Sequence, residues 1–265
     1  MKTSDGERPA TAWGRNELDD PHSNASKARK VRDMFSAIAR SYDLNNRLHS
    51  LWMDVGWRRL AVRMAAVKPG DEVLDVACGT GDLSQAFATM TPAARVVGSD
   101  FTPAMLDLAR VKQRRQAPKG ASRLSYVEAD AQSLPFPDAS FDVVSIAFGI
   151  RNVQDPTRAF SEFARVLRPA GRLVVLEFDT PRLAPVRWFN DFYAGRVMPV
   201  TATVISGDRS GAYSYLPKSV RTFLSRDALI EAIVSAGFMA PKVRELSMGI
   251  CCCYGTSLAN RPERP

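Results

Sequence analysis

The chain has 265 residues, of which 45% are hydrophobic and 24% charged, which is the composition of a globular protein and excludes wholesale disorder. Its net charge of +8 is compatible with a solvated face, an anionic membrane surface or nucleic acid, because charge alone does not choose a partner. Four cysteines, three of them adjacent, and two histidines provide neither a disulfide framework nor the spacing of a metal site.

The N-terminal part of the chain changes character near residue 29. Residues 1–28 are polar and lack the apolar core of a signal peptide, so we expect a flexible tail. Val31, Met34 and Ile38 then follow helical spacing, and a second helix is expected over about 57–67. No apolar run reaches the roughly 18 residues of a membrane span. We therefore expect a cytoplasmic protein.

From residue 73 onward, short apolar strands alternate with helices. Such alternation predicts an α/β fold with a doubly wound, mostly parallel sheet. An aromatic insertion over 180–224 interrupts the rhythm before a last helix and two closing strands, which gives seven strands in one domain over 29–258, followed by a tail over 259–265. The expected strands are 73–77, 95–99, 124–128, 141–148, 173–178, 242–247 and 250–257, and the expected helices after residue 70 are 82–90, 103–116, 156–167 and 226–236.

The first strand-to-helix turn is rich in glycine. It contains Asp75, Gly79, Thr80 and Gly81, and Asp100 ends the next strand about 20 residues later. Ligands of open α/β sheets bind at the carboxyl ends of the strands, where such an acid accepts hydrogen bonds from ribose hydroxyls. Two glycines alone are a weak signal and also suit a tight turn, but this context favours a nucleoside cofactor.

The residues around the loop favour S-adenosylmethionine over a dinucleotide. A dinucleotide site has a third glycine where this chain has Ser84, and Asp82 at the start of the helix would repel a pyrophosphate. A cofactor with a sulfonium and an ammonium group suits an acidic rim. Asp130, after the third strand, is placed to bond the adenine amino group or to cap a turn.

Several longer motifs resemble a known family. The segment 75–82 is similar to the cofactor loop of class I methyltransferases, which have a Rossmann-like fold. The more specific segments resemble the C-methyltransferases of menaquinone and ubiquinone biosynthesis, and the resemblance covers about 31–255. These segments are Tyr42-Asp43, Leu134-Pro135-Phe136-Pro137-Asp138, Phe148-Gly149-Ile150-Arg151-Asn152, Arg165-Val166-Leu167-Arg168-Pro169, Leu176-Glu177-Phe178 and Tyr213-Ser214-Tyr215-Leu216.

The resemblance implies methylation of a ring carbon on a polyprenylated quinol, with the choice of quinol open. By matching positions, the expected cofactor contacts are Thr80, Asp100, Asp130 and Ala131, in addition to Asp75, Gly79 and Gly81 of the loop. Ala147 stands where the family often has a cofactor-contacting serine. The expected substrate-facing, catalytic residues are Tyr42, Arg151 and Asn152.

Each of these three residues also has a structural interpretation. Arg151 is suited to stabilise a phenolate, since a guanidinium stays charged, and the alternative is a structural ion pair at the strand end. Asn152 orients a ring oxygen or caps a turn, and Tyr42 contacts the quinol or belongs to the core. His49 has the pKa of a general base, although a lone histidine is more often structural.

Other functions remain open at this point. The positive charge also suits a methyltransferase acting on RNA or on another small aromatic molecule, but no nucleic-acid motif is present, so we expect no nucleic-acid partner. A non-catalytic binding module is a third alternative. A polyprenylated substrate favours peripheral membrane contact, through the basic stretch 110–123 or the aromatic insertion. A homodimer or a biosynthetic complex remains open.

Overall fold

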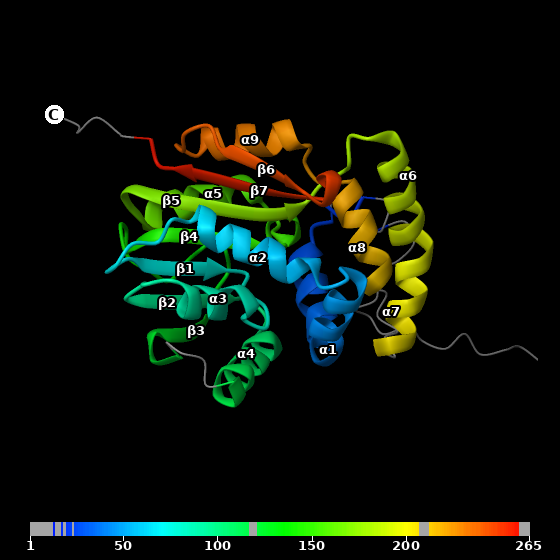
Figure 1. Ribbon diagram of the computed structural model, residues 1–265, viewed down its shortest axis with the longest axis horizontal. Helices are drawn as coiled ribbons and strands as arrows, with labels where there is room; N and C mark the ends of the chain where they lie inside the picture. The colour runs from blue at the N-terminus through cyan, green and yellow to red at the C-terminus, as the bar shows by residue number, and fades with distance from the viewer. Residues whose placement is uncertain are drawn as a thin grey trace, which may run out of the picture.

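The computed structural model describes residues 13, 17, 20–22, 24–116, 121–206 and 212–259. Within them, the strands form a seven-stranded sheet in the order β3-β2-β1-β4-β5-β7-β6, which confirms the predicted fold class (Figure 1). β7 is antiparallel to both of its neighbours, and the other pairs are parallel. The strands are β1 (Glu72–Val76), β2 (Arg95–Asp100), β3 (Leu124–Glu128), β4 (Phe141–Ala147), β5 (Leu167–Phe178), β6 (Lys242–Leu246) and β7 (Cys251–Ser257).

Helices cover both faces of the sheet, because the central strands are apolar on both sides. On one face, α2 (Met53–Met64) and α3 (Asp82–Met90) pack against the sheet in an apolar cluster with Trp57 and Phe87. On the other face, α5 (Pro156–Val166) and α9 (Arg226–Ser235) contribute Phe160, Phe163 and Ile233. The helix α4 (Pro103–Gln116) lies beside β2 and β3.

A third layer lies beyond the carboxyl ends of the parallel strands (Figure 1). It consists of α1 (Lys27–His49) and the insertion, whose elements are α6 (Ala184–Phe192), the π-helix η4 (Tyr193–Val197), α7 (Met198–Ser206) and α8 (Ala212–Arg221). Val31, Met34 and Ile38 of α1 face Ala202 and Tyr215 of the insertion, which confirms the helical pattern of α1. Short 3-10 turns occur at η2 (Ala121–Arg123), η3 (Ile150–Asn152) and η5 (Ser247–Gly249).

Most predicted boundaries agree with the structure within about two residues; the starts of β5 and α2 differ by more, and α2 ends at Met64 instead of 67. The strand β5 begins at Leu167 instead of 173, because the segment around Pro169 and Gly171 stays in the sheet past a register shift. The helix α2 begins at Met53 instead of 57, directly after Trp52, which has a left-handed backbone. Neither feature has a signal in the hydrophobic pattern.

The expectation of a flexible tail over 1–28 is corrected for the described residues of that segment. The ring of Trp13 is buried and stacks on Tyr215 with 4.7 Å between the ring centroids. The imidazole Nε2 of His22 lies 3.0 Å from the carbonyl oxygen of Ser219, and Lys27 is buried. Trp13, His22 and Lys27 therefore hold the described part of this segment against the domain, although its composition is polar. The other residues of 1–28, and residues 260–265, lie outside the described residues.

Candidate active site

The glycine loop between β1 and α3 is held to the end of β2 by backbone hydrogen bonds. The N–H of Cys78 donates to the carbonyl oxygen of Ser99 at 2.9 Å, and the N–H of Gly79 donates to the Asp100 carboxylate at 2.8 Å. Gly81 has a φ of +82°, and a Cβ there would lie 2.3 Å from the hydroxyl oxygen of Tyr126. The loop therefore needs glycine at this position for both its conformation and its space.

The loops after β1 and β4 are in close contact at the point where the strand order reverses. Ala77 and Phe148, the first residues after these strands, have positive φ values of 52° and 56°. A Cβ on Gly149 would lie 2.6 Å from the Cβ of Ala77, so only glycine permits this approach. Strained backbone persists where the surrounding structure enforces it, and it concentrates at functional sites.

Two adjoining cavities open at this point. The first has a volume of about 700 Å³ and is lined by residues of α1, of α4, of the end of β2 and of the segments that follow β3 and β4, among them Asp100, Met105, Asp130, Ala131 and Asn152. The second has a volume of about 360 Å³ and is lined by Arg58, Asp75, Cys78, Thr80, Asp82 and Leu83. Both are lined by Tyr42, Ala77, Gly79, Ala147 and Phe148, so the two cavities meet above the glycine loop.

The structure brings most of the predicted cofactor residues to these cavities. Asp100 accepts from the N–H groups of Gly79 and Thr102, at 2.8 Å each, and burial raises the pKa of its carboxyl. Asp130 is exposed and accepts from the N–H of Gln132 at 2.9 Å, so the turn-capping role considered for it is present. Thr80 lines the second cavity. Gly81 shapes the loop and lines neither cavity.

Asp75 lies at the bottom of the second cavity. Its two carboxylate oxygens accept from the hydroxyl groups of Ser84 at 2.6 Å and Ser145 at 2.8 Å. Burial raises its pKa to about 6. The side chain therefore supports the loop from below, and each of its carboxylate oxygens already accepts a hydrogen bond from a serine.

The three predicted catalytic residues differ in their exposure to the cavities. Tyr42 and Asn152 line the first cavity, and the Asn152 amide oxygen accepts from the hydroxyl of Tyr215 at 3.0 Å. Arg151 is buried behind the cavity, where it pairs with Glu177 and donates to the carbonyl oxygen of Phe148 at 2.9 Å. The structural ion pair considered for Arg151 is therefore present, and its Nε is buried without a hydrogen-bond partner.

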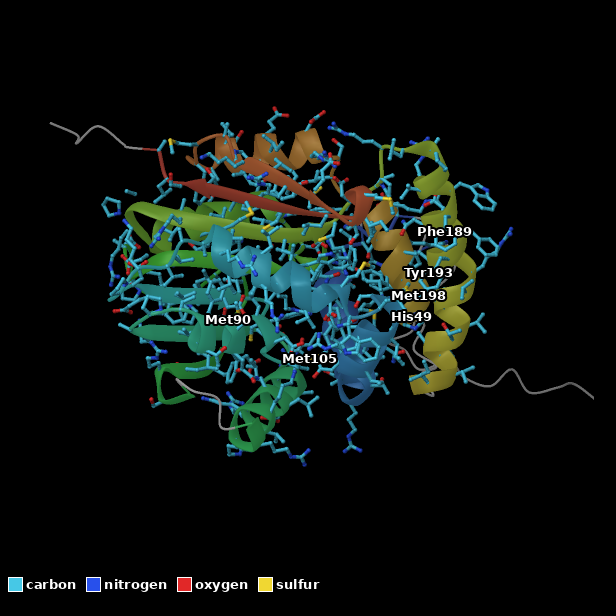
Figure 2. The ribbon with its side chains drawn as sticks, in the orientation of Figure 1. His49, Met90, Met105, Phe189, Tyr193 and Met198 are labelled. Atoms are coloured by element: carbon cyan, nitrogen blue, oxygen red, sulfur yellow. The ribbon has the colours of Figure 1, made fainter. Side chains whose placement is uncertain are left out.

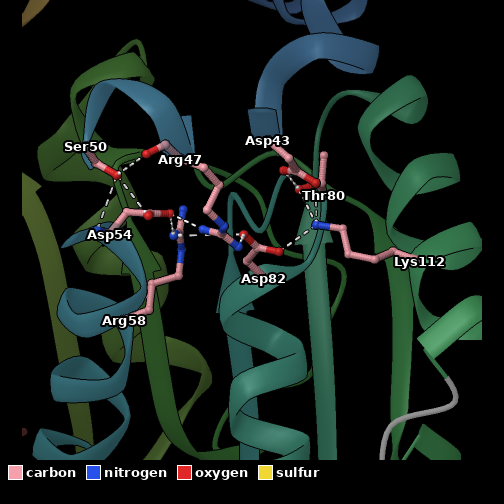
Figure 3. A network of polar contacts seen from close by, with 8 residues as sticks. All are labelled: Asp43, Arg47, Ser50, Asp54, Arg58, Thr80, Asp82 and Lys112. Carbon is pink, nitrogen blue, oxygen red and sulfur yellow. Dashed lines mark hydrogen bonds and ion pairs between the residues drawn. The ribbon is translucent and has the colours of Figure 1, made fainter. Parts of the chain in front are cut away.

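A network of charged side chains from four helices surrounds the glycine loop (Figure 3). We call it the rim network; it consists of Asp43, Arg47, Asp54, Arg58, Asp82 and Lys112, three acids and three bases. Asp82 accepts from Arg47 at 2.7 Å and from Lys112 at 2.6 Å, while Asp54 accepts from Arg47 and Arg58. Lys112 also pairs with Asp43 at 2.6 Å and donates to the Thr80 hydroxyl. Contacts between opposite charges offset part of the cost of removing these groups from water.

The sequence analysis missed the rim network, and it named Glu177 and Tyr215 only within family motifs, without a role. Asp82 was recognised as an acid at the helix start, but its partners come from α1, α2 and α4, and no local pattern links them. The candidate base His49 lies elsewhere: its Nδ1 is 3.0 Å from the Tyr193 hydroxyl, between α1 and the insertion (Figure 2). Its side chain lines neither cavity.

The groups in the two cavities fit S-adenosylmethionine. The first cavity combines carboxylates, which suit ribose and adenine donors, with apolar residues that suit a purine ring. The second combines an arginine with carboxylates, which suit the two charges of an amino acid. The N-terminus of α3 carries Asp82, which is unfavourable for the phosphates of a dinucleotide.

Comparisons with known proteins agree with this geometry. The model of the ubiE/COQ5 methyltransferase family matches residues 23–257. A demethylmenaquinone methyltransferase of Thermus thermophilus is 47% identical over 77% of this chain and 91% of the relative. A ubiquinone/menaquinone biosynthesis C-methyltransferase UbiE of a Geobacter species is 42% identical over 87% of this chain and 97% of the relative.

Solved structures share the fold at low sequence identity. A SAM-dependent methyltransferase of Aquifex aeolicus has a TM-score of 0.53 and 16% identity, over 93% of this chain and all of that one. Phosphoethanolamine N-methyltransferase 2 of Haemonchus contortus, solved with S-adenosyl-L-methionine, has a TM-score of 0.52 and 21% identity, over 71% of this chain and 38% of that one. These likenesses support the Rossmann-like methyltransferase fold.

Proposed function

The chain belongs to the ubiE/COQ5 methyltransferase family, and on that basis we propose that it transfers a methyl group from S-adenosylmethionine to a ring carbon of a polyprenylated quinol. The substrate is a demethylmenaquinol, a polyprenyl-methoxy-benzoquinol or both, in menaquinone or ubiquinone biosynthesis. The observation that carries the proposal is the pair of joined cavities at the carboxyl ends of β1 and β4. The first cavity provides Asp100 and Asp130 for a nucleoside, and Tyr42 and Asn152 line the same cavity.

The chemistry needs an activated ring carbon. When bound, S-adenosylmethionine supplies an electrophilic methyl group on its sulfonium. A quinol that has lost a hydroxyl proton shares its negative charge with the neighbouring ring carbon. That carbon would take the methyl group as the methyl–sulfur bond breaks, with S-adenosylhomocysteine as the leaving group, and would then lose its own proton to restore the aromatic ring. The protein's task is to hold the ring in line, at about 3–3.5 Å from the methyl group, and to stabilise the phenolate.

Three side chains are proposed for that task. Tyr42 and the Asn152 amide lie at the cavity wall, where they position the ring and its oxygen. The Asn152 amide nitrogen donates to the Phe148 carbonyl oxygen at 3.3 Å, and the amide oxygen accepts from Tyr215, so the side chain is held at both ends. Arg151 donates to the same Phe148 carbonyl and, paired with Glu177, lies behind the wall. In this arrangement Arg151 acts on the phenolate through its electric field.

Other methyl acceptors find less support. The RNA alternative was based on the net positive charge. The basic stretch 110–123 contributes to that charge, but three of its six basic residues are engaged within the chain. Lys112 belongs to the rim network, Arg110 pairs with Asp107, and Arg123 donates to the carbonyl oxygens of Ala88 and Ala93. Arg114 and Arg115 are exposed, and Lys119 lies outside the described residues. The remaining charge is small for a nucleic-acid surface.

Because half of the basic residues of 110–123 are engaged within the chain, we propose that the insertion makes the membrane contact. In the described part of the chain, no helix combines the length and apolarity that crossing a bilayer requires. The insertion instead exposes apolar side chains: Trp188 is 71% exposed and Val204 79%, and Phe189, Phe192, Val200 and Ile205 are exposed as well. Arg187 lies within α6 and Arg196 within η4. Exposed aromatics beside arginines suit the interface of an anionic membrane, where a polyprenylated quinol resides.

Two measurements test the proposal. Purified protein with labelled S-adenosylmethionine should methylate a quinone-depleted lipid extract supplied with demethylmenaquinol under reducing conditions, and should leave RNA unlabelled; labelled RNA with unlabelled lipid would contradict the proposal. Sedimentation should show more binding to anionic than to neutral vesicles at low salt, with a loss as salt rises. Equal binding to both, or light scattering that shows the apolar face buried in a homodimer, would contradict the membrane contact.

A further inference from the structure

Trp13 precedes the region that matches the family model, yet it packs against a side chain that reaches the candidate active site. The match covers residues 23–257. The indole of Trp13 is 5% exposed and stacks on the Tyr215 ring of α8, with 23° between the two planes. The Nζ atom of Lys30, in α1, lies 5.5 Å from the centroid of the indole, which is a cation–π distance. The indole is therefore held by α1 and α8 together.

Tyr215 connects Trp13 to the first cavity. The Tyr215 side chain lines neither cavity, but its hydroxyl donates to the amide oxygen of Asn152, which lines the first one. Burial raises the pKa of the Tyr215 hydroxyl, so the hydroxyl keeps its proton and remains a donor. The amide nitrogen of Asn152 donates to the Phe148 carbonyl oxygen. Because an amide nitrogen has two N–H groups, one of them remains for a ligand among the described residues.

Other contacts join the beginning of the described chain to the same two elements, α8 and η3. The imidazole Nε2 of His22 lies 3.0 Å from the carbonyl oxygen of Ser219 in α8. The ammonium of Lys27 donates at 2.6 Å to the carbonyl oxygen of Val153, the residue that follows η3 and lines the first cavity. These contacts hold together the two elements that the hydrogen bond from Tyr215 to Asn152 connects.

We propose that Trp13 is a positioning residue for the methyl transfer, which fixes the Tyr215 ring and, through its hydroxyl, the orientation of the Asn152 amide. The inference rests on the proposed function, in which that amide positions the oxygen of the quinol ring. A hydrogen bond to this oxygen becomes stronger as negative charge develops on it. A misaligned amide therefore costs more in the transition state than in the bound quinol. Trp13 lines neither cavity, so it acts through Tyr215.

Steady-state kinetics on the full chain tests the two links separately. Trp13→Ala removes the stacked ring, whereas Tyr215→Phe keeps that ring and removes the donor to Asn152. Each variant should lower kcat for a demethylmenaquinol with a shortened prenyl tail by about 3- to 10-fold, the effect of one lost hydrogen bond. The KM for the quinol and the affinity for S-adenosylhomocysteine should stay within about twofold of wild type, because the loss is confined to the transition state.

A conservative variant and a matched control accompany them. Trp13→Phe should recover most of kcat, because a phenyl ring keeps the stack and the indole Nε1 has no hydrogen-bond partner among the described residues. Tyr193→Phe should keep full kcat: its hydroxyl also lies 3.0 Å from a side-chain atom, the Nδ1 of His49, but neither residue lines a cavity (Figure 2).

A double-mutant cycle identifies the residue through which Trp13 acts. In an Asn152→Ala background, Trp13→Ala should lower kcat no further than about twofold, because the amide that it positions is absent. A full additional loss in that background, or a kcat loss matched by weaker S-adenosylhomocysteine binding, would overturn the inference in favour of general loosening of the fold. Unchanged kcat in Tyr215→Phe would overturn it as well, even where Trp13→Ala fails to fold. A wild type that methylates no quinol would overturn the proposed function, and the inference with it.

Discussion

The rim network and the insertion meet at the same end of the sheet, yet the rim network buries charged side chains whereas the insertion exposes apolar ones. In the rim network, Asp54 and Arg58 are 3% and 9% exposed. In the insertion, Trp188 is 71% exposed and Phe189 62%. Charge is buried only where opposite charges meet, and large apolar side chains gather at the surface where they serve an interaction. The contrast separates a site that is built within the chain from a surface for which we propose a membrane contact.

The largest effect is expected at the buried pair behind the cavity. Arg151→Leu leaves the Glu177 carboxylate buried and unpaired, which should lower the free energy of unfolding by about 3–5 kcal/mol. Adding Glu177→Leu should restore much of that stability, because a buried ion pair is replaced by apolar groups. Urea unfolding of the two variants measures both numbers.

The double variant then separates stability from catalysis. If Arg151 acts on the phenolate, the refolded Arg151→Leu, Glu177→Leu protein should bind S-adenosylhomocysteine normally and still turn over slowly. Normal turnover in that protein would reduce Arg151 to a structural residue.

The sheet and the glycine loop were predictable because their signals are local. Apolar runs fix the strands, and two glycines with Asp100 mark the cofactor end within about 20 residues of each other. The rim network was not predictable, because its six members come from four helices and meet only through tertiary packing. The role of Trp13 was hidden for a related reason: one aromatic ring in a polar segment has no periodicity to reveal it.

The second-largest effect concerns how the free energy of unfolding depends on pH. It arises from Asp75, the buried acid below the glycine loop. Asp75 has a pKa of about 6 in the folded protein, against about 3.9 in an unfolded chain. The folded state therefore binds the proton more tightly, so this contribution to stability is complete below about pH 4 and is lost as pH rises through 6. Two pKa units correspond to about 3 kcal/mol.

Asp75→Asn should abolish that dependence. Its free energy of unfolding should improve relative to wild type by up to about 3 kcal/mol between pH 4 and pH 7.5, as followed by urea titrations across that range. Parallel pH profiles for the two proteins would mean that Ser84 and Ser145 stabilise the carboxylate enough to keep Asp75 ionised.

A third, smaller effect is expected at the cofactor end. Asp100→Ala removes the acceptor for the Gly79 and Thr102 N–H groups as well as the proposed ribose contact. Its affinity for S-adenosylhomocysteine should fall by about 1.5–3 kcal/mol by calorimetry. Asp107→Ala, on the exposed side of α4, provides the matched loss of charge and should bind normally. Unchanged binding by Asp100→Ala would remove the acid from the cofactor site.

The smallest effect is expected at Trp188, a large side chain that is 71% exposed. Trp188 stacks on Phe192 with 6.0 Å between the ring centroids, but both rings face solvent, so Trp188→Ser removes little buried area. Its free energy of unfolding should stay within about 0.5 kcal/mol of wild type, the usual range for surface substitutions. Its binding to anionic vesicles should nevertheless fall clearly, because the indole is a main contributor to the proposed interfacial contact. A loss of several kcal/mol in the free energy of unfolding would show that Trp188 contributes to the packing of the fold. The insertion, like the rim network, would then be a part of the molecule that is built within the chain.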